Sequence, residues 1–237
     1  MESSSALGYM PQYGVEHISM LVLTVVTSVV SVPAFRRFNA APAFGWLLLA
    51  AMIFWTAWGF LPGNYTIEQS WPLHFSDALR VIAAIALITR AKWAVAVTIL
   101  WGTTINLMSL IFPDVHYMQV PWLEFVMYWL LHIAVFVAAL VLVFSFGEKL
   151  GFGGVVMSII ISVAWGLMCL VVNETLGSNY GYLSREPESS SLLDVFGGWP
   201  FYIVVEALIL FLAWSIWAWA IQKLEVPYLP KTRKVTA

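Results

Sequence analysis

Residues 121–145 read PWLEFVMYWLLHIAVFVAALVLVFS, and Glu124 and His132 are the only side chains in this stretch that ionise near neutral pH. A helix needs about 20 consecutive, mostly apolar residues to cross the ~30 Å hydrocarbon layer of a bilayer. The stretch is long enough and apolar enough to do so. It therefore predicts a transmembrane helix.

Apolar runs of the same kind occupy nearly the whole chain on either side of this stretch. Hydrophobic residues make up 61% and charged residues 10% of the 237 residues, whereas soluble domains have about 45–50% apolar and about 25% charged residues. Backbone groups in lipid must be hydrogen-bonded within their own segment, and the runs lack the alternation of barrel strands, so the spans are helices. We expect residues 1–237 to form a single all-α, polytopic transmembrane domain, a seven-helix bundle with spans at residues 17–34, 44–61, 73–90, 93–112, 121–145, 152–173 and 199–222.

The basic residues indicate how this bundle is oriented. They follow the first, third, fifth and seventh predicted spans, whereas the opposite side carries only Arg185 and most of the acidic residues. Because cytoplasmic loops are enriched in Lys and Arg, we expect the N-terminus outside and the C-terminus in the cytoplasm. The chain should be a multi-pass protein of the cell membrane, the inner membrane in a bacterium, with membrane lipids as partners. The net charge of -2 offers no basic face for nucleic acid.

Ionisable residues within a span are costly in lipid and mark candidate functional sites. In the third predicted span, WPLHFSDALR places His74, Asp77 and Arg80 at intervals of three, along one stripe of the helix. Glu206 lies at a similar depth in the last span, so we expect Arg80 to pair with Asp77, with Glu206 or with both. Ser76 lies roughly 200° around the helix from His74, so a base for Ser76 must come from elsewhere.

Polar residues of three predicted spans converge on the outer half of the bundle. They are His17, His74, Asp77 and His132, and we expect them to surround a pocket beneath the external surface. Zinc held by three of these histidines is an alternative, but no helix carries the pair of histidines at i and i+4 that marks a helical zinc site. We therefore predict no metal or cofactor. The loop at about residues 174–198 is rich in turn formers and acidic residues, and it either caps the pocket or is an ordinary solvated loop.

Several short motifs, namely GVEH, PLHFSD, NYGYLSREP, SLLD and GGWPFY, occur in an order and spacing typical of one family. With them, the chain resembles the YwaF-type integral membrane proteins, which include the vertebrate transmembrane protein 164. The resemblance spans nearly the whole chain. The matching residues are His17, Pro72, Leu73, His74, Asp77, His132, Asn179, Tyr180, Leu183, Pro187, Leu193, Asp194, Trp199, Pro200 and Tyr202.

The resemblance implies an all-helical fold, and the vertebrate relative looks like an acyltransferase that acts on ether phospholipids through a cysteine. Many bacterial relatives carry Cys where this chain has Ser76, and Gly198 stands where a proline is usual. Serine can accept an acyl group, but it depends on an activating base more than cysteine does. The candidate base from a neighbouring helix is His132.

We therefore expect a lipid-modifying enzyme, an acyltransferase or hydrolase of a lipid acyl ester, with an outer-facing polar site. His74 or His132 would be the general base, Asp77 would orient a histidine, and Ser76 would be the nucleophile. The residues expected to bind the substrate are His17, Arg80, Asn179, Tyr180, Asp194, Trp199 and Glu206. The alternative is a non-enzymatic carrier or accessory subunit that binds a small ligand, in which the same polar cluster holds the ligand or joins helices.

Overall fold

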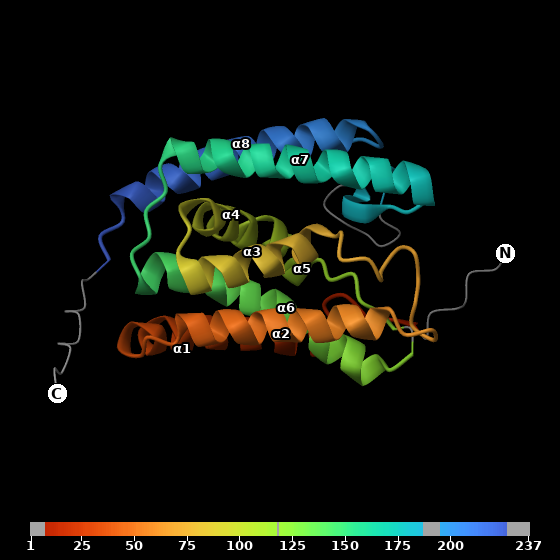
Figure 1. Ribbon diagram of the computed structural model, residues 1–237, viewed down its shortest axis with the longest axis horizontal. Coiled ribbons are helices and arrows are strands. Elements are labelled where there is room, and N and C mark those ends of the chain that lie inside the picture. Colours follow the sequence, from red (N-terminus) through yellow and green to blue (C-terminus); the bar gives the residue numbers. More distant parts are fainter. Residues whose placement is uncertain (1–7, 118, 187–194, 227–237) are drawn as a thin grey trace.

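The fold is a bundle of long helices, shown by a computed structural model that describes residues 8–117, 119–186 and 195–226 (Figure 1). A pair of two-residue strands, β1 (Gly8–Tyr9) and β2 (His116–Tyr117), joins antiparallel at one end. The helices are α1 (Val15–Arg37), α2 (Ala41–Gly59), α3 (Phe75–Thr89), α4 (Lys92–Thr103), α5 (Ile105–Ile111), α6 (Pro121–Leu140), the π-helix η1 (Val141–Ser145), α7 (Phe152–Leu176), the 3-10 turn η2 (Tyr180–Tyr182) and α8 (Phe201–Lys223).

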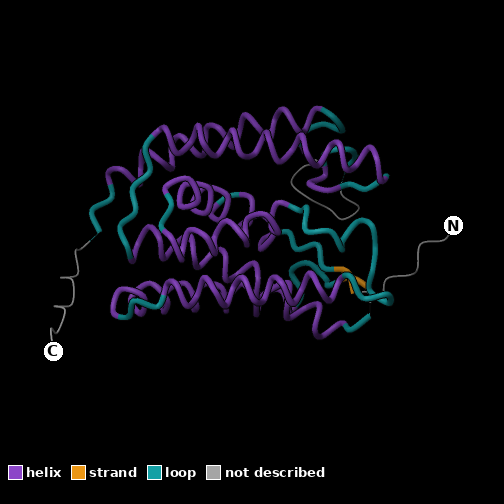
Figure 2. The backbone as a smooth tube through the Cα atoms, viewed as in Figure 1, coloured by secondary structure: helices purple, strands orange, loops and turns teal. Residues whose placement is uncertain are grey.

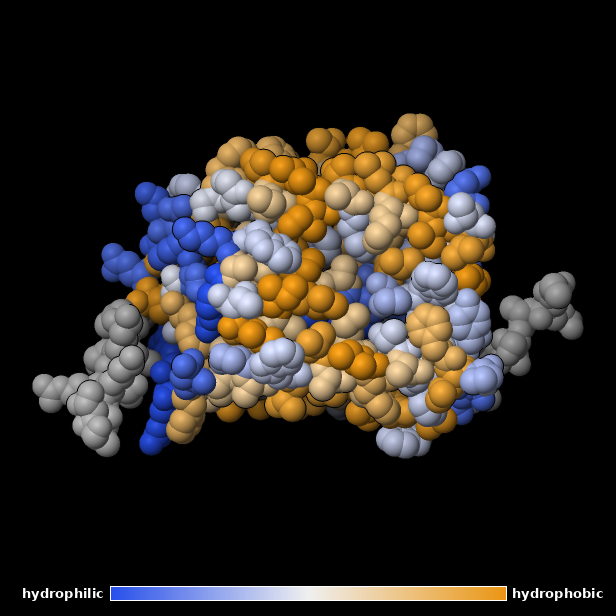
Figure 3. All heavy atoms as spheres, in the orientation of Figure 1, coloured by the Kyte–Doolittle hydropathy of each residue, from blue (hydrophilic) through white to orange (hydrophobic). Residues whose placement is uncertain are grey.

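The helices are stacked in layers, with α7 and α8 on one side, α3 and α4 in the middle, and α1, α2 and α6 on the other side (Figures 1 and 2). Helix α4 is the centre, because it contacts α3, α6 and α7 and every residue from Ala94 to Gly102 is buried. By contrast, the outward faces of α1, α7 and α8 expose large apolar side chains such as Val29, Val171 and Leu208. In Figure 3, hydrophobic atoms cover much of the middle of the molecule, as expected for a protein whose solvent is lipid.

Six helical segments are long and apolar enough to cross a membrane, which confirms a polytopic all-α membrane protein. They are Val15–Arg37, Ala41–Gly59, Lys92–Ile111, Pro121–Ser145, Phe152–Leu176 and Phe201–Lys223, close to the predicted bounds. The predicted span at residues 73–90 is a shorter helix, because α3 has 15 residues and begins only after the extended residue His74. At 1.5 Å per residue it is about 22 Å long, and it lies inside the bundle.

The predicted span at residues 93–112 is interrupted, and the interruption lies in the wall of a cavity. Helix α4 ends and α5 begins at Thr104, whose φ of -122° and ψ of -80° are not helical. The hydroxyl groups of Thr103 and Thr104 donate to the carbonyl groups of Ile99 and Leu100, one turn earlier. Trp214 of α8 donates its indole N–H to the Thr104 hydroxyl at 3.0 Å, which fastens α8 to the break.

Three basic residues, Arg36, Arg90 and Lys149, connect helices at the end of the bundle opposite to the strands. This end is called here the basic end. Arg36 donates from Nε and Nη2 to the Phe144 carbonyl in η1, at 2.9 and 2.6 Å. The Arg90 guanidinium lies 3.7 Å from the Glu148 carboxylate and 3.7 Å from the centre of the Phe146 ring. Lys149 donates to carbonyl groups at the end of α8. The other end, called the loop end, consists of the strands, residues 60–74 and η2.

Candidate functional site

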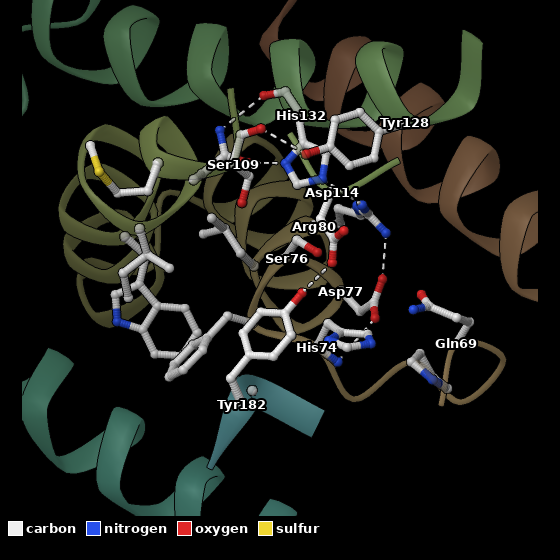
Figure 4. Close-up of a pocket in the computed structure, with 18 of the residues that line it drawn as sticks. Gln69, His74, Ser76, Asp77, Arg80, Ser109, Asp114, Tyr128, His132 and Tyr182 are labelled. Carbon is white, nitrogen blue, oxygen red and sulfur yellow. Dashed lines mark hydrogen bonds and ion pairs between the residues drawn. The ribbon is translucent and has the colours of Figure 1, made fainter. Parts of the chain in front are cut away.

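A cavity of about 550 Å³ lies in the loop-end half of the bundle. Its walls come from α2, the loop after α2, α3, the end of α4, α5 and the segment after it, α6, η2 and α8. Six of the residues predicted for the site line this cavity, namely Glu206 and five others whose convergence is shown in Figure 4. These are His74, Ser76, Asp77, Arg80 and His132.

The first turn of α3 supplies the polar floor of the cavity. His74 is the N-cap residue, and Asp77 accepts a hydrogen bond from the His74 backbone N–H at 3.1 Å. Nε2 of His74 lies 2.9 Å from the Glu68 carbonyl oxygen. A carbonyl only accepts, so Nε2 carries the hydrogen and Nδ1 carries the lone pair. Ser76 lies in the same turn, and within the described chain neither its N–H nor that of Phe75 has a hydrogen-bond partner, as is usual for the start of a helix.

Arg80 lies one turn deeper, and it forms the expected ion pair with Asp77. Its Nη2 also lies 3.4 Å from Nε2 of His132 on α6. Nδ1 of His132 lies 2.8 Å from the side-chain oxygen of Asn106, whose amide N–H₂ donates to the His132 carbonyl at 3.0 Å. This donation orients the amide of Asn106, so Nδ1 of His132 carries the hydrogen and Nε2 accepts from Arg80. His132 is therefore neutral and holds Arg80 in place.

Two carboxylates in the cavity wall have different surroundings. Glu206 of α8 lines the cavity, but no ion pair joins it to Arg80 among the described residues, so of the expected alternatives the structure has the pairing of Arg80 with Asp77. Asp114 also lines the cavity and accepts a hydrogen bond from the Tyr182 hydroxyl at 2.9 Å. Burial, and then the Asp114 carboxylate, raise the pKa of Tyr182 well above its ordinary value, so the hydroxyl keeps its proton.

Sequence reasoning missed Asp114 as a site residue, because it lies in the short connection before a predicted span rather than within a span. Tyr182 was also missed, because it belongs to a loop whose path to the cavity cannot be predicted from hydropathy. Tyr128 could have been proposed from the sequence, because it lies one helical turn before His132 in the same predicted span. Its ring lies 4.3 Å from that of His132, and its hydroxyl donates to the Ser109 carbonyl at 2.7 Å.

The structure places His17 outside the cavity. It is fully buried, its Nε2 lies 3.0 Å from the Leu110 carbonyl oxygen, and its Nδ1 accepts from the Tyr13 N–H at 2.8 Å. Its ring also lies against that of Trp129, with 5.6 Å between ring centres. His17 therefore joins α1 to α5 and α6 rather than reaching the other three residues of the predicted cluster.

The three predicted loop residues that the structure describes support the loop end without lining the cavity. Asn179 accepts from the backbone N–H groups of Ser184 and Arg185 at 3.2 and 3.1 Å. Tyr180 is fully buried, donates to the Ile67 carbonyl and accepts from the Trp71 N–H at 3.2 Å. The indole N–H of Trp199 donates to the Leu183 carbonyl at 2.9 Å. Asp194 lies outside the described residues.

A model of the TMEM164 family matches residues 12–218, and these residues include the whole lining of the cavity. The chain belongs to the TMEM164 family. No curated protein and no solved structure matches it. Within the described part of this TMEM164-family chain, no three His, Cys, Asp or Glu side chains are grouped so that they could hold a metal ion.

The arrangement combines a hydroxyl group, two histidines and a buried ion pair with apolar walls. Ser76 lies where the unpaired N–H groups of a helix N-terminus favour negative charge. Such donors stabilise the oxyanion that forms when a hydroxyl group attacks an ester. The cavity of this TMEM164-family protein is thus polar at the start of α3 and apolar over much of its remaining wall.

Proposed function

We propose that this TMEM164-family protein is a membrane-embedded enzyme that acts on the acyl ester of a lipid, as an acyltransferase or hydrolase. The observation that carries the proposal is the position of Ser76, in a largely apolar cavity and at the start of α3 with two unpaired backbone N–H groups beside it. The resemblance to relatives with a cysteine at this position supports the same role, because serine and cysteine both accept acyl groups.

The general base in this proposal is His74 rather than His132. The lone pair of His132 Nε2 already accepts from Arg80, and the guanidinium charge disfavours a second positive charge beside it. His74 is the extended N-cap residue of α3 rather than a helical one, so the angular spacing expected within a continuous helix does not apply to it, and its Nδ1 lone pair lies at the same end of α3 as Ser76. Within the described residues no hydrogen bond joins the two side chains. Catalytic hydrogen bonds often form only when the substrate is bound.

The chemical step then balances as follows. The Ser76 oxygen attacks the acyl carbonyl carbon, and its proton passes to His74 as the tetrahedral oxyanion forms near the N–H groups of α3. The bond from that carbon to the lipid oxygen breaks, and His74 returns the proton to this leaving oxygen. Water or a second lipid hydroxyl group then takes the acyl group from Ser76 by the reverse sequence. Asp77 orients His74 through its backbone N–H.

A fluorophosphonate probe with an alkyl chain tests this reaction on the purified protein in lipid. We expect covalent labelling of the wild type and none of Ser76→Ala. Ser109→Ala is the matched control, because Ser109 lines the same cavity and has no role in the proposed reaction. His74→Gln should label roughly 10²- to 10⁴-fold more slowly, the usual contribution of a general base. Equal labelling of Ser76→Ala and the wild type would contradict the proposal.

A second candidate function is supported by one observation. Asp77, Arg80, His132 and Asn106 are joined to one another by an ion pair and hydrogen bonds, as expected for a polar network that joins helices around a ligand site without performing chemistry. A carrier or accessory subunit built in this way would bind the probe reversibly and without covalent labelling. The same experiment therefore separates the two functions.

We also propose that the chain crosses the membrane seven times, with α3 as the short additional crossing, in the inner membrane of a bacterium. Helix α3 runs from the loop end, where His74 contacts Tyr180, to the basic end, where Arg90 contacts Glu148. An odd number of crossings and the basic end in the cytoplasm place the N-terminus outside. In a Cys169→Ala background, an impermeant maleimide should label Gly63→Cys but not Asn39→Cys in cells whose inner membrane is intact. The reverse result would contradict this orientation.

A further inference from the structure

The carboxylate of Glu206 lies in the part of the cavity wall that α8 forms. Three apolar residues of the same helix also line the cavity, namely Ile209, Leu210 and Ala213. They follow Glu206 at three, four and seven positions, so all four side chains share one face of α8. One turn before Glu206, the Tyr202 hydroxyl donates to the carbonyl group of Tyr182, another lining residue. Glu206 therefore faces the cavity rather than the lipid.

No group of the described chain holds the Glu206 carboxylate by a hydrogen bond or an ion pair. The other carboxylates of the described lining all accept hydrogen bonds from the protein, and they are Asp77, Asp114 and Glu124. An ionisable side chain within a membrane span is costly, and it usually faces a partner or a functional cavity. Glu206 is thus a buried acidic group that the proposed reaction does not use.

The charges and rings of the cavity wall favour a positively charged ligand group. The described lining has four carboxylates and a single guanidinium, that of Arg80. A cavity with one prevailing sign of charge concentrates ligand groups of the opposite sign. Aromatic rings, whose faces attract ammonium groups, line the cavity from several elements and include Trp55, Trp58, Tyr128 and Tyr182. This combination suits an organic ammonium group.

A second charged group of the wall also has an unused hydrogen-bonding atom. The side chain of Arg80 is 5% exposed, and its Nε has no acceptor within the part of the chain that the structure describes. Buried donors without an acceptor are rare, and a ligand oxygen would satisfy this one. Arg80 and Glu206 do not pair with each other. A headgroup whose phosphate and ammonium are separated by two carbon atoms can contact both.

We propose that Glu206 binds the ammonium group of a zwitterionic ligand whose phosphate lies on the Arg80 side of the cavity. The inference rests on the proposed function in one respect, because it names the headgroup of the lipid whose acyl ester reacts at Ser76. The ammonium contact itself requires no reaction. Glu206 is a specificity-determining residue in this proposal. A phospholipid headgroup and free phosphoethanolamine share this chemistry, so the experiment tests both sources.

Two lysophospholipids with the same photoreactive acyl chain compare headgroups on the full chain in phosphatidylglycerol nanodiscs. One probe carries phosphoethanolamine and the other phosphoglycerol, and a Ser76→Ala background prevents turnover. Cross-linking to cavity peptides should favour the phosphoethanolamine probe by roughly 10- to 100-fold, the contribution of a charge-assisted hydrogen bond. Glu206→Gln should abolish this preference, whereas Glu206→Asp should retain part of it. Glu174→Gln is the matched control, because Glu174 is an exposed carboxylate near the end of α7.

Free phosphoethanolamine, followed by tryptophan fluorescence, tests the soluble source. A response that Glu206→Gln abolishes, without a lipid preference, supports the ammonium site with a soluble ligand, and a lipid preference alone supports the phospholipid. The inference is overturned if neither signal appears, or if the lipid preference persists in Glu206→Gln.

Thermal unfolding and probe labelling separate this inference from a structural role and from the reaction. Glu206→Gln should unfold at a temperature no lower than the wild type, because it removes a charge that no protein group compensates. A lower temperature with an unchanged headgroup preference would make Glu206 a structural residue and overturn the inference. Fluorophosphonate labelling of Ser76 is measured independently in the wild type. Its absence alone would contradict the reaction and leave the ammonium site standing.

Discussion

Replacement of Arg80 by leucine should destabilise the fold more than removal of any other charge. The Arg80 and Asp77 side chains in their ion pair are 5% and 12% exposed. Removal of one partner from a buried pair leaves the other charge uncompensated and costs about 3 to 5 kcal/mol. Because 1.4 kcal/mol corresponds to a factor of ten, the ratio of folded to unfolded protein should fall by roughly a hundredfold to several thousandfold.

The loss can be separated into its parts by a double-mutant cycle. Asp77→Asn keeps an acceptor for the His74 N–H and removes the charge that Arg80→Leu leaves behind. The double variant should therefore be more stable than Arg80→Leu alone by at least about 1 kcal/mol, a typical coupling energy within a network. Arg37→Leu is the control, since Arg37 is an exposed cation at the end of α1, and it should change stability by less than about 0.5 kcal/mol.

Unfolding by a denaturing detergent, followed by tryptophan fluorescence in bicelles, gives the required free energies. The reasoning is refuted if Arg80→Leu unfolds at the same detergent fraction as the wild type. It is also refuted if the two single losses simply add in the double variant, because the charges would then not interact.

Three further substitutions test the assignments around the site. His17→Phe leaves the Leu110 carbonyl without its His17 partner and should cost about 1–3 kcal/mol of stability. Probe labelling should be unchanged, so loss of labelling in a folded variant would place His17 in the reaction. Asn106→Leu leaves the buried Nδ1–H group of His132 without a partner and should cost a similar amount of stability in thermal unfolding assays, so wild-type stability would contradict the network. Tyr180 has its pKa raised by burial to about 12, so its stabilising contribution is complete below the ordinary tyrosine pKa of about 10 and is lost as the pH rises through the folded-state value. The stability advantage of the wild type over Tyr180→Phe should shrink over that pH range, and a constant difference would refute this assignment.

The sequence predicted most of the spans because the hydropathy of a membrane helix is a property of its own segment. It could not predict the short α3, since the helix start at Phe75 depends on the capping contact between His74 and Asp77. The break at Thr104 could not be predicted either, because threonine at that position is compatible with a continuous apolar helix.

The site could be predicted where residues share a helix and could not where they belong to different helices. Asp77 and Arg80 are three residues apart, so their pairing follows from helix geometry alone. The depths of His17 and Glu206 were estimated from the sequence, but depth does not specify the direction in which a side chain points around its helix. His17 faces Leu110 and Glu206 faces the cavity without reaching Arg80, and both outcomes depend on how the helices rotate against one another.

The double hydrogen bond from Arg36 to the Phe144 carbonyl has a consequence for experiments on biogenesis. In the proposed orientation, Arg36 is one of the charges that keep the flank after α1 in the cytoplasm during insertion, and in the folded protein it also binds the π-helix η1. Charge-reversal mutagenesis at this position would alter both at once, so a misassembled product would not by itself report a flipped insertion. Arg37, one residue further on, contributes the same sign of charge without that contact and is the cleaner place to probe how the nascent chain is threaded.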